Sequence, residues 1–242
     1  ASFEASAVSY LYYADRIYQI NLAIAGIAVG TVSLPVLAKA FKEKNSSKIS
    51  NIQSRSLELS LLLSIPASIG LISASKEIVN ALFGYGSFTI ENINMTALAL
   101  KYFGYGIPAF ALIKILSNFF FARNNTKTPF YISTFIVLLN ILISITFFNK
   151  VGFVIIPIAT SISTWIGVMI YIYLLNDKNF LLLKNYLPKN IFKIILNTVF
   201  MSFLLILALD YYGDYLDYNY KYKSVYLLII VGFVGSVYLV SC

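Results

Sequence analysis

Residues 17–38 read IYQINLAIAGIAVGTVSLPVLA, and this stretch contains no charged side chain. A helix needs about 20 mostly apolar residues to cross the hydrocarbon layer of a bilayer, so the stretch is long enough to span a membrane. Of the 242 residues, 59% are hydrophobic and 12% are charged, whereas soluble domains carry about 25% charge. A water-soluble fold of this size cannot bury so much apolar surface. The sequence therefore predicts an all-α integral membrane protein.

Similar apolar stretches follow along the chain, and together they predict about seven transmembrane helices in a single transmembrane region over residues 1–242. The expected spans are 5–38, 56–75, 94–122, 129–149, 151–176, 190–209 and 224–242. In the first span, the GxxxG spacing of Gly26 and Gly30 favours close packing against another helix. The sequence opens without an initiator Met and in a segment that looks like a loop already under way, so we expect a fragment of a longer protein.

The basic residues divide unevenly between the two sides of the membrane. If the helices alternate in direction, the loops at 39–55, 123–128 and 177–193 share one side, which holds eleven Lys or Arg residues. The opposite side holds five, namely Lys76, Lys101, Lys150, Lys221 and Lys223. The positive-inside rule assigns the first side to the cytoplasm, and it places the C-terminal Cys242 there as well. The net charge of +8 thus follows from topology, and we expect no nucleic-acid partner.

The sequence contains none of the patterns that common enzymes use. It has no histidine and one cysteine, and it has no P-loop, GxSxG, HExxH or paired-carboxylate motif. We therefore expect no catalytic residues, no metal and no cofactor. A membrane-embedded enzyme such as a lipid-modifying transferase is the alternative from another class, but it would need acids or histidines clustered at one membrane face. The sequence offers neither cluster.

Charged residues inside the predicted spans are the strongest candidates for function, because each costs about 2.5–3.5 kcal/mol at bilayer depth. Asp15 and Arg16 are adjacent in LYYADRIYQIN, so on a helix they point about 100° apart and do not suit a mutual salt bridge. Arg16 either anchors the helix at a lipid interface or lines a central cavity, where its planar fork of donors suits a pyrophosphate. Lys114 either extends to the cytoplasmic surface or lines the same cavity.

Three segments resemble a known family, the lipid II flippases of the MurJ (MviN) type in the MOP exporter superfamily. The segments are SYLYYADRIYQINLAIAGIAVGTVSLPVLAK at 9–39, LFGYGSFT at 82–89 and KILSNFFFARNNTKTP at 114–129. The resemblance implies a 14-helix transporter of two lobes, of which this chain is the C-terminal lobe plus two extra helices, about helices 8 to 14. The N-terminal lobe and helix 7 would then be missing partners.

The resemblance also implies roles for particular residues. Arg16 corresponds to the cavity arginine of the C-terminal lobe, which holds the lipid pyrophosphate together with arginines of the N-terminal lobe, and Asp15 is its usual neighbour. Some relatives bind sodium with an Asn and an Asp four residues apart and a Thr on the following helix. Asn140 and Thr160 match that pattern, but Ser144 stands where the acid would be, which weakens the prediction of a sodium site.

The function that follows is export of the undecaprenyl-linked peptidoglycan precursor, lipid II, from the inner to the outer leaflet of the bacterial cytoplasmic membrane, with membrane lipids as further partners. Within the same superfamily, a polysaccharide-unit or multidrug exporter is the alternative, and it would lack the YYADR and FGYGSFT pair. An inactive truncated remnant is a third reading.

Overall fold

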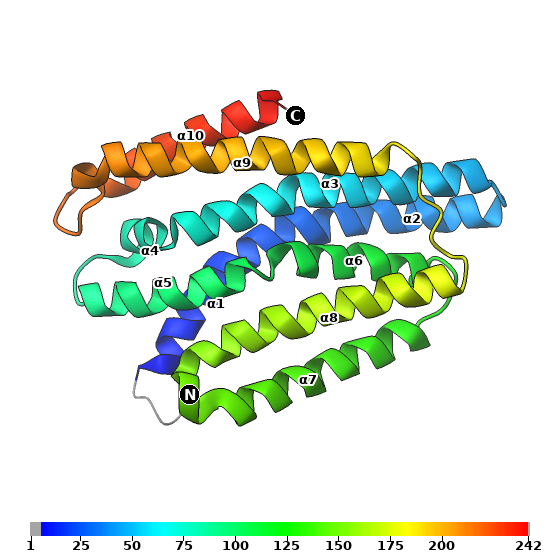
Figure 1. Cartoon of the computed structure of the whole chain (residues 1–242), viewed down its shortest axis with the longest axis horizontal. Helices are drawn as coiled ribbons and strands as arrows, with labels where there is room; N and C mark the ends of the chain where they lie inside the picture. The colour runs from blue at the N-terminus through cyan, green and yellow to red at the C-terminus, as the bar shows by residue number, and fades with distance from the viewer. Residues whose placement is uncertain (1–5, 242) are drawn as a thin grey trace.

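The computed structural model describes residues 6–241, and within that range the chain is all helical, as predicted (Figure 1). The predicted start of the first span at residue 5 and the C-terminal Cys242 lie outside the described residues. In chain order the elements are α1 (Ala7–Leu22), the π-helix η1 (Ala23–Ala28), α2 (Val29–Lys42), α3 (Ser46–Ser73), α4 (Ser75–Phe83), α5 (Ile90–Gly104), α6 (Ile107–Phe121), α7 (Lys127–Val151), the short 3₁₀ helix η2 (Gly152–Val154), α8 (Ile155–Asp177), α9 (Leu187–Tyr211), the 3₁₀ helix η3 (Gly213–Leu216) and α10 (Lys223–Ser241).

The first long helix runs without interruption through α1, η1 and α2. Its glycines face α6, because a Cβ on Gly26 would lie 3.2 Å from the Cα of Ala111. The carbonyl of Gly30 accepts a hydrogen bond of 2.7 Å from Asn118 Nδ2 on the same helix α6. The close packing that the GxxxG spacing predicts is therefore present, because the two glycines let the backbones of two helices approach closely.

Side-chain caps fix where α3 and α5 begin. Asn45 Oδ1 accepts a hydrogen bond from the backbone nitrogen of Lys48 at 3.0 Å, and Thr89 Oγ1 accepts one from that of Asn92 at 3.3 Å. Each cap satisfies one of the backbone donors that a helix N-terminus leaves unpaired. Helix α3 consequently starts at Ser46, well before the span predicted over 56–75.

The span predicted over 94–122 consists of two helices, α5 and α6, which meet at an angle of 40°. The break has a local cause, because Pro108 lies in the first turn of α6 and has no backbone N–H to donate to the preceding turn. Gly104 and Gly106 flank the break, and a Cβ on Gly106 would lie 2.8 Å from Ser161 Oγ. Small residues therefore let a neighbouring helix come close to the exposed backbone.

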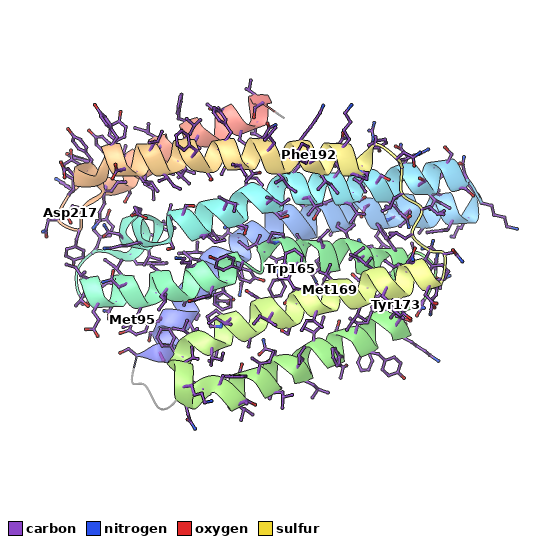
Figure 2. All side chains as sticks on the ribbon, viewed as in Figure 1. Met95, Trp165, Met169, Tyr173, Phe192 and Asp217 are labelled. Carbon is purple, nitrogen blue, oxygen red and sulfur yellow. The ribbon has the colours of Figure 1, made fainter. Side chains whose placement is uncertain are left out.

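Side chains of α3 and α8 satisfy three carbonyls that lie at this break. The bonds are Ser68 Oγ to the carbonyl of Gly104 (2.7 Å), Ser161 Oγ to that of Tyr102 (2.7 Å) and Trp165 Nε1 to that of Tyr105 (2.9 Å). Figure 2 shows Trp165 on α8, on the side that faces the break. Broken helices are tolerated at membrane depth when neighbouring side chains satisfy the freed backbone groups in this way.

Helices α7 and α8 form an antiparallel pair (Figure 1). The helical stretch Lys127–Asp177 is apolar enough to cross a membrane and reverses direction near Gly152, whose φ of 74° lies in the left-handed region that favours glycine. By length and composition five helical stretches could cross a membrane, and the α5–α6 pair makes a sixth. Counting α7 and α8 separately brings the described chain to seven, and the individual spans stay a prediction.

The connections gather at two ends of the bundle. One end holds the α4–α5 turn, the α7–α8 reversal and the α9–α10 loop, and the other holds the α2–α3, α6–α7 and α8–α9 connections (Figure 1). The second group coincides with the three Lys- and Arg-rich loops, and we call it the basic end. The helices thus alternate in direction, as the count of basic residues assumed.

Arg123 fixes the α8–α9 connection at the basic end. Its guanidinium lies 4.1 Å from the ring centroids of both Phe41 and Phe180, and it donates to the carbonyls of Phe119 (2.7 Å) and Phe180 (2.8 Å). Burial lowers the pKa of Arg123 to about 10, so the group stays charged at neutral pH. The guanidinium of Arg123 therefore binds groups of the protein itself.

Ser161→Ala tests the capping of the break. The substitution leaves the carbonyl of Tyr102 without its donor in an apolar surrounding, so we expect the free energy of unfolding to fall by about 1 kcal/mol. Circular dichroism during unfolding in mixed detergent micelles measures the change. The control is Ser236→Ala on the exposed face of α10, whose hydroxyl bonds only the carbonyl of Phe233 on its own helix. Equal losses in both variants would contradict the assignment.

Candidate functional site

Arg16 lies on α1 with an exposed side chain, and its guanidinium carbon is 4.7 Å from the ring centroid of Tyr12. Within residues 6–241 no carboxylate or carbonyl accepts a hydrogen bond from it. The contact with Tyr12 orients the side chain but leaves its five donors free. The position therefore offers a planar cation for an anionic ligand.

Asp15 does not pair with Arg16, which agrees with their 100° separation on the helix. Its carboxylate instead accepts a short hydrogen bond from Gln19 Nε2, one turn further along α1. Asp15 is half-buried whereas Arg16 is exposed, so the two side chains face different surroundings. The structure thus places the neighbours on one helix and gives them different contacts.

Lys114 lies too far along the bundle to share a phosphate with Arg16. Its stem packs beside Gly26, where a Cβ would lie 3.6 Å from Lys114 Cγ. Gly26 follows Arg16 by ten residues, which corresponds to about 15 Å along the axis of a helix. Lys114 on α6 is exposed like Arg16 on α1, and the two cations lie at different levels along the bundle.

Aromatic packing fixes the N-terminal end of α1, and the sequence gives no sign of it. The ring of Tyr13 lies 4.8 Å from that of Phe83 and 5.3 Å from that of Phe88, centroid to centroid. Nearby, Tyr10 donates a hydrogen bond of 3.1 Å to Asn92 Oδ1. The resembling segments at 9–39 and 82–89 therefore meet in space, although the sequence gives no signal that they do.

The proposed sodium ligands do come together, as a hydrogen-bonded group. Asn140 Nδ2 donates to Thr160 Oγ1 at 2.8 Å, and Ser144 Oγ donates to Asn140 Oδ1 at 3.4 Å. Thr160 Oγ1 also donates to the carbonyl of Ile156 at 2.7 Å. All three side chains are neutral, and residues 6–241 contain no group of three His, Cys, Asp or Glu side chains that could hold a metal. The arrangement suits an interhelical bond between α7 and α8.

The sequence counts Lys223 among the five lysines on the side opposite the three basic loops and gives no sign of burial, but the structure buries it at the start of α10. Its ammonium contacts the segment 82–89 that carries the family resemblance. Nothing in the sequence separates it from the exposed Lys221 two residues earlier, because both follow a tyrosine in the same polar stretch.

Comparisons with known proteins agree on one family. The family model described as "Lipid II flippase MurJ" matches residues 1–226. A probable lipid II flippase MurJ from Rickettsia prowazekii is 34% identical over 241 residues, covering 100% of this chain and 46% of the relative. One from Rhizobium meliloti is 39% identical over 170 residues, covering 70% of this chain and 32% of the relative. The chain thus spans less than half the length of these curated relatives.

Solved structures show the same fold. A lipid II flippase MurJ in an inward closed conformation superimposes with a TM-score of 0.79 at 30% identity, covering 99% of this chain and 47% of that one. An outward-facing multidrug resistance MATE transporter of the MOP superfamily gives a TM-score of 0.61 at 17% identity, covering 98% of this chain and 54% of that one. The second likeness concerns the fold alone.

Asn140→Ala tests whether the polar group between α7 and α8 serves packing. Removal of the amide takes away the bond to Thr160, so we expect the free energy of unfolding to fall by about 0.6 kcal/mol in both NaCl and KCl. Thermal unfolding in detergent in each salt measures this, with Thr146→Ala on the exposed face of α7 as the control. A wild-type stabilisation specific to sodium that Asn140→Ala abolishes would contradict the packing role.

Proposed function

The chain belongs to the MurJ family of lipid II flippases in the MOP superfamily, and from this we propose that its parent protein moves the undecaprenyl-pyrophosphate-linked peptidoglycan precursor across the membrane. Transport would run from the inner to the outer leaflet of the bacterial cytoplasmic membrane. Rocking of two lobes around a central site suffices for such a step, and it requires no covalent chemistry.

The observation that carries the proposal is the free guanidinium of Arg16 on a helix long and apolar enough to span the membrane. A cation at bilayer depth is costly unless it faces a partner or a water-filled cavity. Arg16 has a ring beside it and no acceptor in residues 6–241. A pyrophosphate supplies pairs of acceptor oxygens that a guanidinium fork can bind through two parallel hydrogen bonds, so the ligand would complete the arginine's bonding.

One face of the long first helix has no other described helix packed on it, and this face would line the cavity. Ile20 on α1 is 61% exposed and Val32 on α2 is 71% exposed, although both lie in an apolar span. We propose that this face meets the N-terminal lobe of the parent protein, which is consistent with a chain that spans less than half the length of its relatives. The lobe would complete the cationic site.

The orientation in the membrane follows from the basic end. Its three loops carry eleven Lys and Arg residues against five on the other side, so we propose that the basic end and the C-terminus face the cytoplasm. Arg16, near the start of the first long helix, would then lie toward the outer half of the membrane. Lys114 on α6 would lie closer to the cytoplasmic side than Arg16.

The other readings are weaker. The solved multidrug resistance transporter shares the fold but only 17% of the sequence. The MurJ relative from Rickettsia prowazekii is 34% identical over the whole of this chain. The polysaccharide-unit exporter has no observation in its favour. A membrane-embedded enzyme has no observation in its favour either, and residues 6–241 contain no group of three His, Cys, Asp or Glu side chains that could hold a metal ion.

Arg16→Ala in the full-length parent tests the proposal in a bacterium depleted of its own lipid II flippase. Loss of a charged hydrogen-bonding group costs about 1.5–3 kcal/mol, so binding weakens about 10- to 100-fold. We expect the wild type to restore growth and the variant to fail, with equal amounts of protein in the membrane. The matched control is Arg55→Ala, which removes an exposed arginine at the basic end and should restore growth.

Two results would contradict parts of this proposal. Restoration of growth by Arg16→Ala as well as by the wild type would make Arg16 an interfacial anchor. A wild-type parent that inserts normally and restores no growth would contradict transport of lipid II.

A further inference from the structure

Lys223 is a buried cation whose three ammonium donors are all used. Its side chain is 1% exposed, and Nζ donates to the carbonyls of Gly84 (2.6 Å) and Tyr218 (2.7 Å) and to Asn80 Oδ1 (3.1 Å). The ammonium also lies 4.4 Å from the ring centroid of Tyr85 and 4.8 Å from that of Tyr218. Lysine is almost never buried so completely without such partners.

The partners of Lys223 come from two parts of the chain. Tyr218 belongs to the α9–α10 loop, whereas Asn80 and Gly84 belong to the end of α4 and the turn that follows it. We call residues 84–89 the outer turn, because the proposed orientation places them outside. A Cβ on Gly84 would lie 2.5 Å from the carbonyl oxygen of Asn80, so glycine is needed for the backbone to approach this closely. The ammonium therefore links the C-terminal helix pair to the outer turn.

Further hydrogen bonds join the same two segments. The bonds are Asn80 Nδ2 to the carbonyl of Leu216 (2.8 Å), Ser224 Oγ to that of Ala81 (2.6 Å) and Tyr218 OH to that of Phe88 (3.2 Å). Asn80 thus accepts from Lys223 and donates to Leu216, so its amide depends on the ammonium for its orientation. Lys223 lies at the centre of this network.

The outer turn in turn holds the helix that carries Arg16. Phe83, directly before the outer turn, and Phe88, within it, both pack on Tyr13 of α1. Tyr13 precedes Arg16 by three residues, which places the two side chains on neighbouring turns of one helix. Contacts thus run from Lys223 through the outer turn to the helix segment that presents Arg16.

We propose that Lys223 is a positioning residue that fixes the outer end of α1, and with it Arg16, through the outer turn. The inference rests on the proposed function of Arg16 for its consequence in transport, but the mechanical link stands on the contacts alone. It also gives the α9–α10 pair a role in the site, although neither helix reaches Arg16.

The network is separable from the docking of the helix pair. An apolar cluster that includes Met201, Leu205, Leu227, Ile230 and Val234 packs α9 and α10 on α3 and α4. Helix α9 also packs along α3 over much of its length (Figure 1). Loss of the ammonium should therefore release the outer turn while the helix pair stays docked, so a variant at position 223 remains a folded protein.

The test measures the position of α1 in the full-length parent with its native cysteines replaced. Nitroxide labels at Val8→Cys, an exposed site in the first turn of α1, and at Met169→Cys, an exposed site on α8 (Figure 2), report one distance by pulsed electron resonance. We expect a single narrow distance in the otherwise unchanged protein. Lys223→Met should replace it with a broad distribution, whereas Lys221→Met, a matched exposed lysine two residues earlier, should leave it narrow.

A narrow distance in Lys223→Met would overturn the proposal. If that variant fails to reach the membrane, Tyr218→Phe removes only the hydroxyl that bonds the carbonyl of Phe88, and it should broaden the distance in the same direction. An unchanged distance in Tyr218→Phe would then overturn the proposal instead.

Growth in the flippase-depleted strain separates this inference from the proposed function. If Arg16 binds substrate, Lys223→Met should reduce growth relative to Lys221→Met, in parallel with the broadened distance. A broad distance in Lys223→Met together with full growth of Arg16→Ala would support the mechanical link and reject the role of Arg16. The two claims can therefore fail independently.

Discussion

The constraint on which the rest of the structure depends is that hydrocarbon offers no water to satisfy backbone polar groups. The break between α5 and α6 exposes carbonyls that an unbroken helix would satisfy, and α3 and α8 each send side chains to them. Those two helices are thereby fixed around the break. The close approach at Gly106 follows from the same arrangement, because α8 must come near enough for the short side chain of Ser161 to reach the break.

Three cations show how differently the fold treats positive charge. Arg123 is held between two phenylalanine rings and donates to two carbonyls, and Lys223 uses all three of its donors. Arg16 contacts one tyrosine ring and has no acceptor in the described part of the chain. The first two charges are compensated by the protein itself. Arg16 is the exception among them, and this difference favours it as the contact for an anionic substrate.

Hydropathy predicts the helical architecture from the sequence because each spanning segment is apolar over its own length, so the information is local. Arg16 could be selected by the same local reasoning. The capping of the break within 94–122 could not, because Ser161 and Trp165 lie 59 and 60 residues from the carbonyls that they cap. The burial of Lys223 was missed for a similar reason, since its acceptor Gly84 lies 139 residues away. Pairings across such separations leave no periodic pattern.

Trp165 is the single tryptophan of the sequence, and its indole N–H is bonded to the carbonyl of Tyr105 at the break. The emission of an indole depends on its hydrogen bonding and on the polarity around it. Tryptophan fluorescence of this chain, excited where tyrosine does not absorb, therefore originates from one known point, between α8 and the bend of α5 and α6. Any rearrangement that straightens or deepens the bend would shift that emission, so this tryptophan reports on the bend without an added dye.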